Sequence, residues 1–390
     1  MYDTIIVGAG FAGTTVAERL ANKGIKVLVI DKRNHIGGNA YDYQKDNILI
    51  HQYGPHIFHT NSKEVFDYLS SFTEWYHYEH RVLGHIQDKV VPIPFNMTSI
   101  EECFEESKAT KLKKILIEEY GEGKKIPIMD LLKNDDEDIK ELANFIFENV
   151  FKYYTMKQWG LKAEEIAPGV TARVPVNVSY DDRYFTDTYQ YLPINGYTAI
   201  FKKMLNHPNI KVELNVDAKD VMKLKDGKIY YRGQEFNGPV IYTGELDRLF
   251  DYKLGDLPYR SLNLVLERKE GTFQKAATEN YPCDKAIKAF TRITEYKHFL
   301  ENEPQDVTYI HTEYPLAFDK NSEKGNVPYY PIFTEDNQKM YDAYVDLAKQ
   351  YSNLYLLGRL AEYKYYNMDA IVYKALKLSD NLIKENENEK

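Results

Sequence analysis

The chain has 390 residues, 43% of them hydrophobic, and carries a formal net charge of −9 with a pI of about 5.7. This length allows two or three domains with a large core, and the acidic balance argues against a general nucleic-acid or anionic-membrane surface. No apolar run approaches the roughly 18 residues of a transmembrane helix. Cys103 and Cys283 are the only cysteines, too few for a disulfide framework or a zinc site. We therefore expect a cytoplasmic protein that binds no nucleic acid, does not insert into membranes and holds no metal.

A glycine motif lies near the start of the chain, between two predicted strands. Residues 4–7 form a β-branched run typical of a buried strand, residues 12–21 predict a helix, and residues 26–30 predict a second strand. The motif Gly-Ala-Gly-Phe-Ala-Gly at 8–13 therefore has the βαβ context that a dinucleotide-binding fingerprint requires.

Each glycine of the motif has a physical role in that fingerprint. Gly8 permits the tight turn, Gly10 lets the backbone approach a pyrophosphate at the helix N-terminus, and Gly13 lets helix and strand pack closely. Asp31 ends the second strand, where its carboxylate can accept hydrogen bonds from a ribose and would repel a 2′-phosphate. The pair Gly37–Gly38 offers a second close backbone approach after that strand, which favours FAD over NAD.

The next part of the chain changes from strand to helix patterns. Residues 80–95 alternate in polarity and predict strands that feed a turn. Between residues 98 and 154, apolar residues recur at helical spacing in two stretches. The acidic run 134–138 precedes the second stretch, where acidic residues suit a helix N-terminus. We expect an inserted helical domain here.

The second half of the chain is rich in predicted strands, which lie at residues 211–217, 229–231, 240–244, 262–266, 307–313 and 354–357. Lys225-Asp-Gly227 predicts a hairpin turn, and residues 369–384 predict a final helix. Because the strand that completes the nucleotide-binding sheet comes last, we expect this domain to be discontinuous in sequence.

Four further motifs distinguish the chain. They are Gly-Pro-His-Ile-Phe-His-Thr at 54–60, Phe-Lys-Tyr-Tyr-Thr-Met-Lys-Gln-Trp-Gly at 151–160, the loop motifs Thr-Ala-Arg-Val-Pro-Val at 171–176 and Asp-Asp-Arg-Tyr-Phe at 181–185, and Gly-Arg-Leu-Ala-Glu-Tyr-Lys-Tyr-Tyr-Asn-Met-Asp at 358–369. With these motifs the chain resembles the bacterial UDP-galactopyranose mutases, from the first strand to the final helix.

The resemblance implies an α/β fold in which a Rossmann-like FAD-binding domain carries an inserted helical domain and a small antiparallel β-sheet domain. We expect the FAD-binding domain at residues 1–75, 196–248 and 335–390, the helical domain at 98–165, and the sheet domain, which binds substrate, at 76–97, 166–195 and 249–334.

The resemblance also implies an activity and partners. The family interconverts UDP-galactopyranose and UDP-galactofuranose with no net redox change, through attack of N5 of reduced FAD on the anomeric carbon. A nucleophile carried by the cofactor divides one difficult step into easier ones. The expected partners are these two nucleotide sugars, a reductant such as NAD(P)H, and a second copy of the chain in a homodimer.

The resemblance assigns site residues in this chain. Arg173 and Arg292 are expected to clamp the diphosphate and offset the departing negative charge. The expected substrate-binding residues are Phe151, Tyr154, Thr155, Trp159, Arg173, Tyr184, Arg292, Tyr314 and Tyr365. The expected cofactor-binding residues are Gly8, Gly10, Phe11, Gly13, Asp31, Lys32, Gly38, Asn39, His56, Ile57, Arg359 and Met368. Of the two histidines in the 54–60 motif, His59 is the candidate for catalysis by packing near the flavin and tuning it, and His56 is the more structural.

Two other functions share the glycine fingerprint. An FAD-dependent amine or protoporphyrinogen-type oxidase would need an apolar substrate tunnel, against which the two arginines and the tyrosine-rich motifs argue. A binding protein of the GDP-dissociation-inhibitor type shares the fold without flavin, against which the intact glycine set argues.

Overall fold

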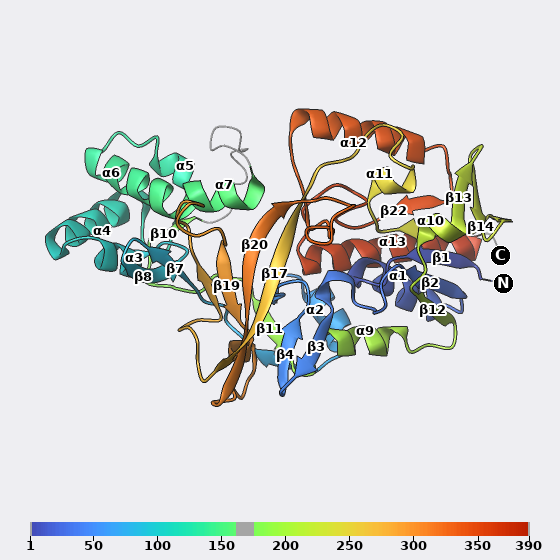
Figure 1. The fold of residues 1–390 in the computed structure, drawn as a ribbon, viewed down its shortest axis with the longest axis horizontal. Coiled ribbons are helices and arrows are strands. Elements are labelled where there is room, and N and C mark those ends of the chain that lie inside the picture. Colours follow the sequence, from blue (N-terminus) through green and yellow to red (C-terminus); the bar gives the residue numbers. More distant parts are fainter. Residues whose placement is uncertain (1, 161–174, 389–390) are drawn as a thin grey trace.

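The computed structural model describes residues 2–160 and 175–388. A helical unit lies at one end of the molecule, an antiparallel sheet in the middle and a parallel sheet with its helices at the other end (Figure 1). Both chain termini lie at the parallel-sheet end, where the first strand and the last helix are neighbours in space (Figure 1).

Strand β1 (Thr4–Val7) is the centre of a five-stranded sheet of order β12-β2-β1-β16-β22, in which every pair of neighbours is parallel. The other strands are β2 (Val27–Asp31), β12 (Ile210–Leu214), β16 (Val240–Tyr242) and β22 (Leu354–Leu356). Strands from both ends of the chain thus form one sheet.

Helices cover both faces of this sheet, because alternate residues of a strand point to opposite sides. Ile6 and Val29 pack in one core with helices α1 and α13, whereas Ile5 and Leu28 pack in another with α12. Burial on both faces explains why the sequence of these strands is apolar throughout. The helices of this part are α1 (Phe11–Ala21), α9 (Tyr197–Leu205), α10 (Ala218–Val221), α11 (Leu246–Leu249), α12 (Glu335–Ala348) and α13 (Met368–Asn388).

A small antiparallel meander follows β12. It consists of β13 (Met222–Lys225), β14 (Lys228–Tyr231) and β15 (Gln234–Phe236). Asp226 and Gly227 join the first two strands with φ values of 52° and 74°, the conformation that favours Asp-Gly in a two-residue hairpin. The predicted hairpin turn is confirmed.

The middle sheet has the order β21-β17-β20-β19-β18-β7-β8. Its neighbours are antiparallel except β18 and β7, which run parallel. Its strands are β7 (Val82–Ile86), β8 (Lys89–Ile93), β17 (Tyr259–Glu270), β18 (Thr278–Asn280), β19 (Arg292–Glu295), β20 (Val307–Ala317) and β21 (Tyr330–Pro331).

The helical unit follows β8. It consists of α3 (Met97–Cys103), α4 (Glu106–Tyr120), α5 (Ile128–Leu131), α6 (Glu137–Ile146), a π-helical turn η2 (Phe147–Lys152) and α7 (Tyr153–Trp159), with a short ribbon of β9 (Lys125–Ile126) and β10 (Val176–Asn177). Asp136 caps α6 by accepting from the backbone N–H groups of Asp138 and Ile139, so the acidic run does mark a helix start.

A third group of short elements joins the two sheets. These are the hairpin β3 (Asp42–Lys45) and β4 (Ile48–His51), the sheet of β5 (Phe58–Thr60), β11 (Tyr189–Pro193) and β6 (Trp75–His77), and the helices η1 (Gly38–Ala40), α2 (Lys63–Ser70) and η4 (Tyr296–Phe299). Because β11 pairs with β5, the 54–60 motif lies beside the segment that follows the 181–185 motif.

The expected fold class is confirmed: an α/β dinucleotide-binding fold carries a helical unit and an antiparallel sheet. The exact domain boundaries stay a prediction. None of the helices in residues 2–160 and 175–388 is long and apolar enough to cross a membrane.

Candidate active site

The glycine motif makes a sharp turn at the carboxyl end of β1. Gly8 has φ of +108°, and a Cβ there would overlap the Thr243 hydroxyl. A Cβ on Gly13 would overlap the Gly8 carbonyl oxygen, so this glycine lets α1 pack directly on the turn. Gly10 is the N-cap of α1, and no side chain caps that helix. Its first turn therefore presents backbone N–H groups that suit an anion.

The second glycine pair faces the first. Gly37 and Gly38 have φ of +97° and +56°, and a Cβ on Gly38 would lie 3.0 Å from the Gly10 Cα. Two backbone segments therefore meet with no side chain between them. They line a cavity, cavity one, which has a volume of about 900 Å³.

Asp31 lies in cavity one with both carboxylate oxygens engaged by backbone. Oδ2 accepts from the Ala9 N–H at 2.8 Å and Oδ1 from the Arg33 N–H at 2.9 Å. Each oxygen keeps a further lone pair for a ribose hydroxyl. The backbone bonds hold the carboxylate at the end of β2, as the sequence predicts.

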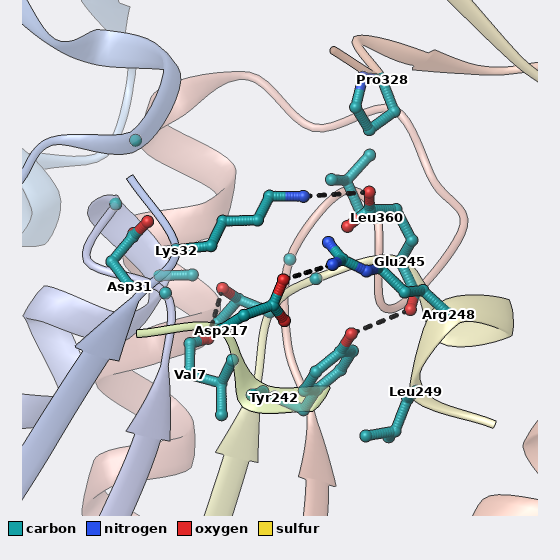
Figure 2. A pocket seen from close by; sticks show the side chains of 18 of the residues that line it. Val7, Asp31, Lys32, Asp217, Tyr242, Glu245, Arg248, Leu249, Pro328 and Leu360 are labelled. Carbon is teal, nitrogen blue, oxygen red and sulfur yellow. Dashed lines mark hydrogen bonds and ion pairs between the residues drawn. The ribbon is translucent and has the colours of Figure 1, made fainter. Parts of the chain in front are cut away.

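Ion pairs form the far wall of cavity one. Figure 2 shows Lys32 reaching toward Glu245 and Arg248 toward Asp217. The Lys32–Glu245 pair, at 3.3 Å, joins residues 213 positions apart. Charged side chains from the βαβ unit and from the α11 segment thus meet across the cavity.

The groups around cavity one fit an adenine dinucleotide. The bare first turn of α1 can bind a pyrophosphate, Asp31 can bind a ribose, and the buried Nη1 of Arg33 has no partner among the described residues. The cofactor-binding residues expected from the sequence that line this cavity are Gly8, Gly10, Phe11, Asp31, Lys32, Gly38, Asn39, His56, Arg359 and Met368. Gly13 lies under the turn, and Ile57 lines the neighbouring cavity instead.

Cavity two has a volume of about 610 Å³ and is bounded by α7, the middle sheet and the segment after β4. One face of the α7 region lines it, formed by Phe151, Tyr154, Thr155, Gln158 and Trp159. These residues have the spacing of a single helix face, so the 151–160 motif acts as one wall.

Arg292 is the cation that β19 presents to cavity two. Its Nε donates to Glu313 Oε2 at 2.9 Å, and Glu313 is only 2% exposed. Although burial opposes the charge, Glu313 holds the pKa of Arg292 well above its usual value. Its two Nη groups have no partner within residues 2–160 and 175–388, so a fork of donors is available to a phosphate ligand.

Tyrosines form the side of cavity two nearest to cavity one. Tyr330 and Tyr365 stack with ring centroids 5.6 Å apart. The Arg359 guanidinium lies 4.6 Å from the Tyr365 centroid and donates to the Tyr329 carbonyl. Burial raises the pKa of Tyr330 to about 12, so its hydroxyl is a hydrogen-bond donor at neutral pH. Tyr184 lines the same cavity.

Tyr314 does not join this group. It lines neither cavity, and its ring packs against Phe290 at 5.9 Å. Successive residues of a strand point to opposite faces, so Glu313 faces Arg292 and Tyr314 faces away. The structure brings Tyr329 and Tyr330 to the cavity in its place.

The two cavities share a wall. The residues that line both are Asn39, His56, Arg359, Asn367 and Met368. His56 interacts with the Gly54 carbonyl through Nδ1, and burial lowers its pKa to about 3, so the ring is neutral. His59 lines cavity two alone and stacks on Phe185. The structure thus brings His56, and not His59, to the junction.

Other residues of the site could not be found from local sequence. Thr278 and Asn280 line cavity two, and their side-chain oxygens are buried without a partner in the part of the chain that the structure describes. The only local signal is their i, i+2 spacing in a short strand. Arg173 lies outside the described residues, so its assignment stays a prediction. No group of three or more possible metal ligands occurs among the described residues.

Comparison with known proteins decides the family. The family model described as UDP-galactopyranose mutase matches residues 149–365, and a Rossmann-like NAD(P)-binding model matches residues 6–72. A UDP-galactopyranose mutase of Mycoplasma genitalium is 36% identical over 98% of this chain and 95% of its own length. The chain belongs to the UDP-galactopyranose mutase family.

Membership makes this protein a mutase, an intramolecular isomerase that rearranges a nucleotide sugar, built on an FAD-binding type of Rossmann domain. The family includes more than one substrate: a dTDP-fucopyranose mutase of Escherichia coli is 32% identical over 99% of this chain and all of its own length. Family membership alone therefore does not choose between the two nucleotide sugars.

Solved structures agree on the fold. The crystal structure of a reduced UDP-galactopyranose mutase superposes with a TM-score of 0.71 at 16% identity, covering 98% of this chain and 94% of that one. A putrescine oxidase reaches 0.60 at 12% identity, covering 98% and 99%. Because the oxidase shares the fold, the mutase assignment depends on the full-length sequence similarity.

Proposed function

We propose that this mutase interconverts UDP-galactopyranose and UDP-galactofuranose, with FAD in cavity one and the nucleotide sugar in cavity two. The observation that carries the proposal is the wall shared by the two cavities. A cofactor whose reactive ring lies at that wall would meet a sugar bound on the other side of it.

The residues of cavity one would hold FAD in a fixed orientation. The bare backbone at Gly10 and Gly38 would admit the pyrophosphate, and Asp31 would bind the adenosine ribose. When bound and reduced, FAD supplies a nucleophilic nitrogen, N5, for the anomeric carbon of the sugar. Neutral His56 would pack at the shared wall without placing a positive charge beside the ring.

The residues of cavity two would bind the UDP portion and hold the departing charge. The two Nη groups of Arg292 and the hydroxyls of Tyr184, Tyr330 and Tyr365 are proposed to donate to the diphosphate. We propose Arg173 as a second cation from the segment after α7. The α7 wall, with Trp159 at its end, is proposed for the uridine and the sugar.

The test compares two substrates in two redox states. The FAD-loaded protein, reduced anaerobically with dithionite, is incubated with UDP-galactofuranose or with dTDP-fucofuranose, and the products are separated by chromatography. We expect rapid conversion of the UDP sugar by the reduced protein, little by the oxidised protein, and slower conversion of the dTDP sugar. Preference for the dTDP sugar would overturn the substrate assignment, and equal rates in both redox states would overturn the role of N5.

NAD(P)H as the reductant, the homodimer and the cytoplasmic location stay predictions. NAD(P)H is tested by anaerobic bleaching of the flavin absorbance.

A further inference from the structure

A carboxylate lies behind one of the cavity-two histidines. His59 Nδ1 is 2.9 Å from Asp187 Oδ2, and the side chains are 14% and 24% exposed. The two residues are 128 positions apart and come together because β5 pairs with β11, whose first residue, Tyr189, follows Asp187 by two positions.

Asp187 is itself held in place. Its other oxygen, Oδ1, accepts from the Asn61 side-chain amide at 2.9 Å, and the Asn61 oxygen accepts from the Thr188 N–H at 2.9 Å. The Asp187 carbonyl accepts from the Gln190 amide at 3.0 Å. Both carboxylate oxygens are thus engaged, and the turn that carries Asp187 is hydrogen-bonded on both sides.

This geometry determines the tautomer of His59. A carboxylate only accepts hydrogen bonds, so Nδ1 must carry the proton that it donates to Asp187. In the neutral ring, Nε2 then has a free lone pair. The ring stacks on Phe185 with centroids 3.6 Å apart and planes at 12°, which fixes its plane at the edge of cavity two.

We infer that Asp187 is a positioning residue that orients His59 as the acid–base group for the sugar's ring oxygens. The inference rests on the proposed function. The step starts with His59 protonated on both ring nitrogens. When the pyranose opens, the C1–O5 bond breaks, its electron pair goes to O5, N5 of the bound cofactor would supply electron density to C1, and O5 takes the Nε2 proton, which leaves the neutral Nδ1–H ring. When the furanose closes, an O4 lone pair forms the C1–O4 bond, the electron pair that stabilised C1 would return to N5 of the bound cofactor, and the O4 proton passes to the Nε2 lone pair left by the first transfer. His59 ends each turnover as it began, and no electrons or protons are consumed.

Other charged and titratable groups face the same region. Besides Asp187, they include His80, from the segment between β6 and β7, and Arg292 from β19. The other titratable side chains that line cavity two are His56, Arg359, Tyr53, Tyr154, Tyr184, Tyr329, Tyr330 and Tyr365. His80 is neutral, because burial lowers its pKa to about 3, with smaller contributions from Arg292 and His59. Among these groups, Asp187 is the carboxylate in direct contact with the His59 ring.

The first test reads the tautomer without any turnover. The ¹⁵N chemical shifts of the His59 ring, measured at a pH where the ring is neutral, should report the Nδ1–H form in the native protein. In Asp187→Asn they should shift toward the Nε2–H form, because the amide nitrogen can donate to Nδ1. An unchanged tautomer would overturn the inference.

The second test is kinetic. Asp187→Asn should lower kcat on the order of 10²-fold, the size of a general acid–base contribution, while KM and the UDP dissociation constant stay within twofold. In a His59→Ala background the same change should have no further effect, because Asp187 acts through His59. Additive losses, or a loss confined to UDP binding, would contradict the inference.

The matched control is Asp182→Asn. Asp182 lies on the same segment but pairs with Arg81 at 2.9 Å and does not line cavity two, so activity should remain. Failure of the proposed function would appear as no conversion by the native enzyme. Failure of this inference would appear as native conversion that Asp187→Asn leaves intact.

Discussion

Gly38 and Gly24 both have positive φ, at +56° and +81°, but their surroundings differ. A Cβ at Gly38 would press on the Gly10 backbone in cavity one, whereas a Cβ at Gly24 would meet nothing within 4 Å. An alanine costs roughly 1 kcal/mol of backbone strain at either position. We expect Gly38→Ala to lower flavin affinity about tenfold or more and Gly24→Ala to retain flavin. The ratio of flavin to protein absorbance after dialysis measures this, and equal losses would contradict the proposed FAD site.

The proposed diphosphate clamp can be tested at Arg292 with a substitution that still neutralises its buried partner, Glu313. Removing the cation would leave the Glu313 carboxylate buried and unpaired, which is strongly destabilising. Arg292→Lys keeps the charge and loses the planar fork. We expect kcat to fall on the order of 10²-fold, with flavin content and Tm close to native. Arg268→Lys is the control, since Arg268 is half exposed and pairs at the surface. Loss of flavin from Arg292→Lys would place this residue in the cofactor site.

Buried histidines give the stability of the fold a pH dependence. Burial lowers the pKa values of His51, His56 and His80 to about 3, below the unfolded value of about 6.5. Each histidine therefore contributes its full share of the free energy of unfolding above pH 6.5, where it is neutral in both the folded and the unfolded state. As the pH falls below 6.5 this contribution is lost, and at pH 5 the loss is roughly 2 kcal/mol per histidine.

Urea midpoints between pH 7 and pH 5 measure this loss. His80→Gln should flatten the dependence, because one proton fewer is taken up on unfolding, whereas exposed His77→Gln should not change the slope. Identical slopes in the native protein and in His80→Gln would refute the prediction.

Among single residues, the sequence predicts those whose role depends only on their neighbours in the chain. Gly8, Gly10 and Asp31 could be placed because a turn, a helix start and a strand end are neighbours in the chain. Glu313 and Asp187 could not, because each acts on a residue that only tertiary pairing brings to it. Tyr314 was expected at the site because the family resemblance matched it to a tyrosine that binds the diphosphate, but the alternation of β20 points it to the other face.

Among the elements, those with a strong local pattern match the predictions. The predicted βαβ unit appears as β1, α1 and β2, and the last strand appears as β22. The arrangement of the middle sheet could not be predicted, because β18 pairs in parallel with β7, far away in sequence. Nothing in three residues of Thr-Glu-Asn identifies that partner, and the wall of cavity two depends on it.

Lys157 attaches α7 to the middle sheet. It is 7% exposed, and its Nζ donates to the carbonyls of Tyr281, Lys288 and Phe290 at 2.7, 3.2 and 2.9 Å. Lys157→Met would leave these carbonyls without their donor, at a cost of roughly 3 kcal/mol. We expect Tm to fall by several degrees and KM for the nucleotide sugar to rise, because the loop after Tyr281 borders cavity two.

The control for Lys157 is Lys140→Met on α6. Lys140 makes a surface ion pair with Glu137 at 3.4 Å, and such pairs contribute about 0.5 kcal/mol or less. Its Tm and KM should stay native. If both variants lower Tm equally, the buried lysine has no special role in holding α7.

Over the whole molecule, the shared wall should couple the two ligands. Arg359 lines both cavities, stacks on the tyrosines of cavity two and donates to the carbonyls of Tyr329 and Tyr366. FAD bound on one side would hold this arginine, and the tyrosines would then be ordered before UDP arrives, which lowers the entropy cost of binding UDP. We expect UDP to bind the FAD-loaded protein about tenfold more tightly than the flavin-free protein.

Thermodynamic linkage supplies an internal check on that coupling, because UDP must then tighten FAD binding by the same factor. Calorimetric titration of UDP into both forms, and of FAD with and without saturating UDP, measures the two factors independently. Arg359→Lys loses the paired contacts to two carbonyls and should reduce both factors to below about twofold. Equal UDP affinities of the two native forms would show that the cavities are adjacent but act separately, and the contact at the shared wall would then serve the chemistry alone.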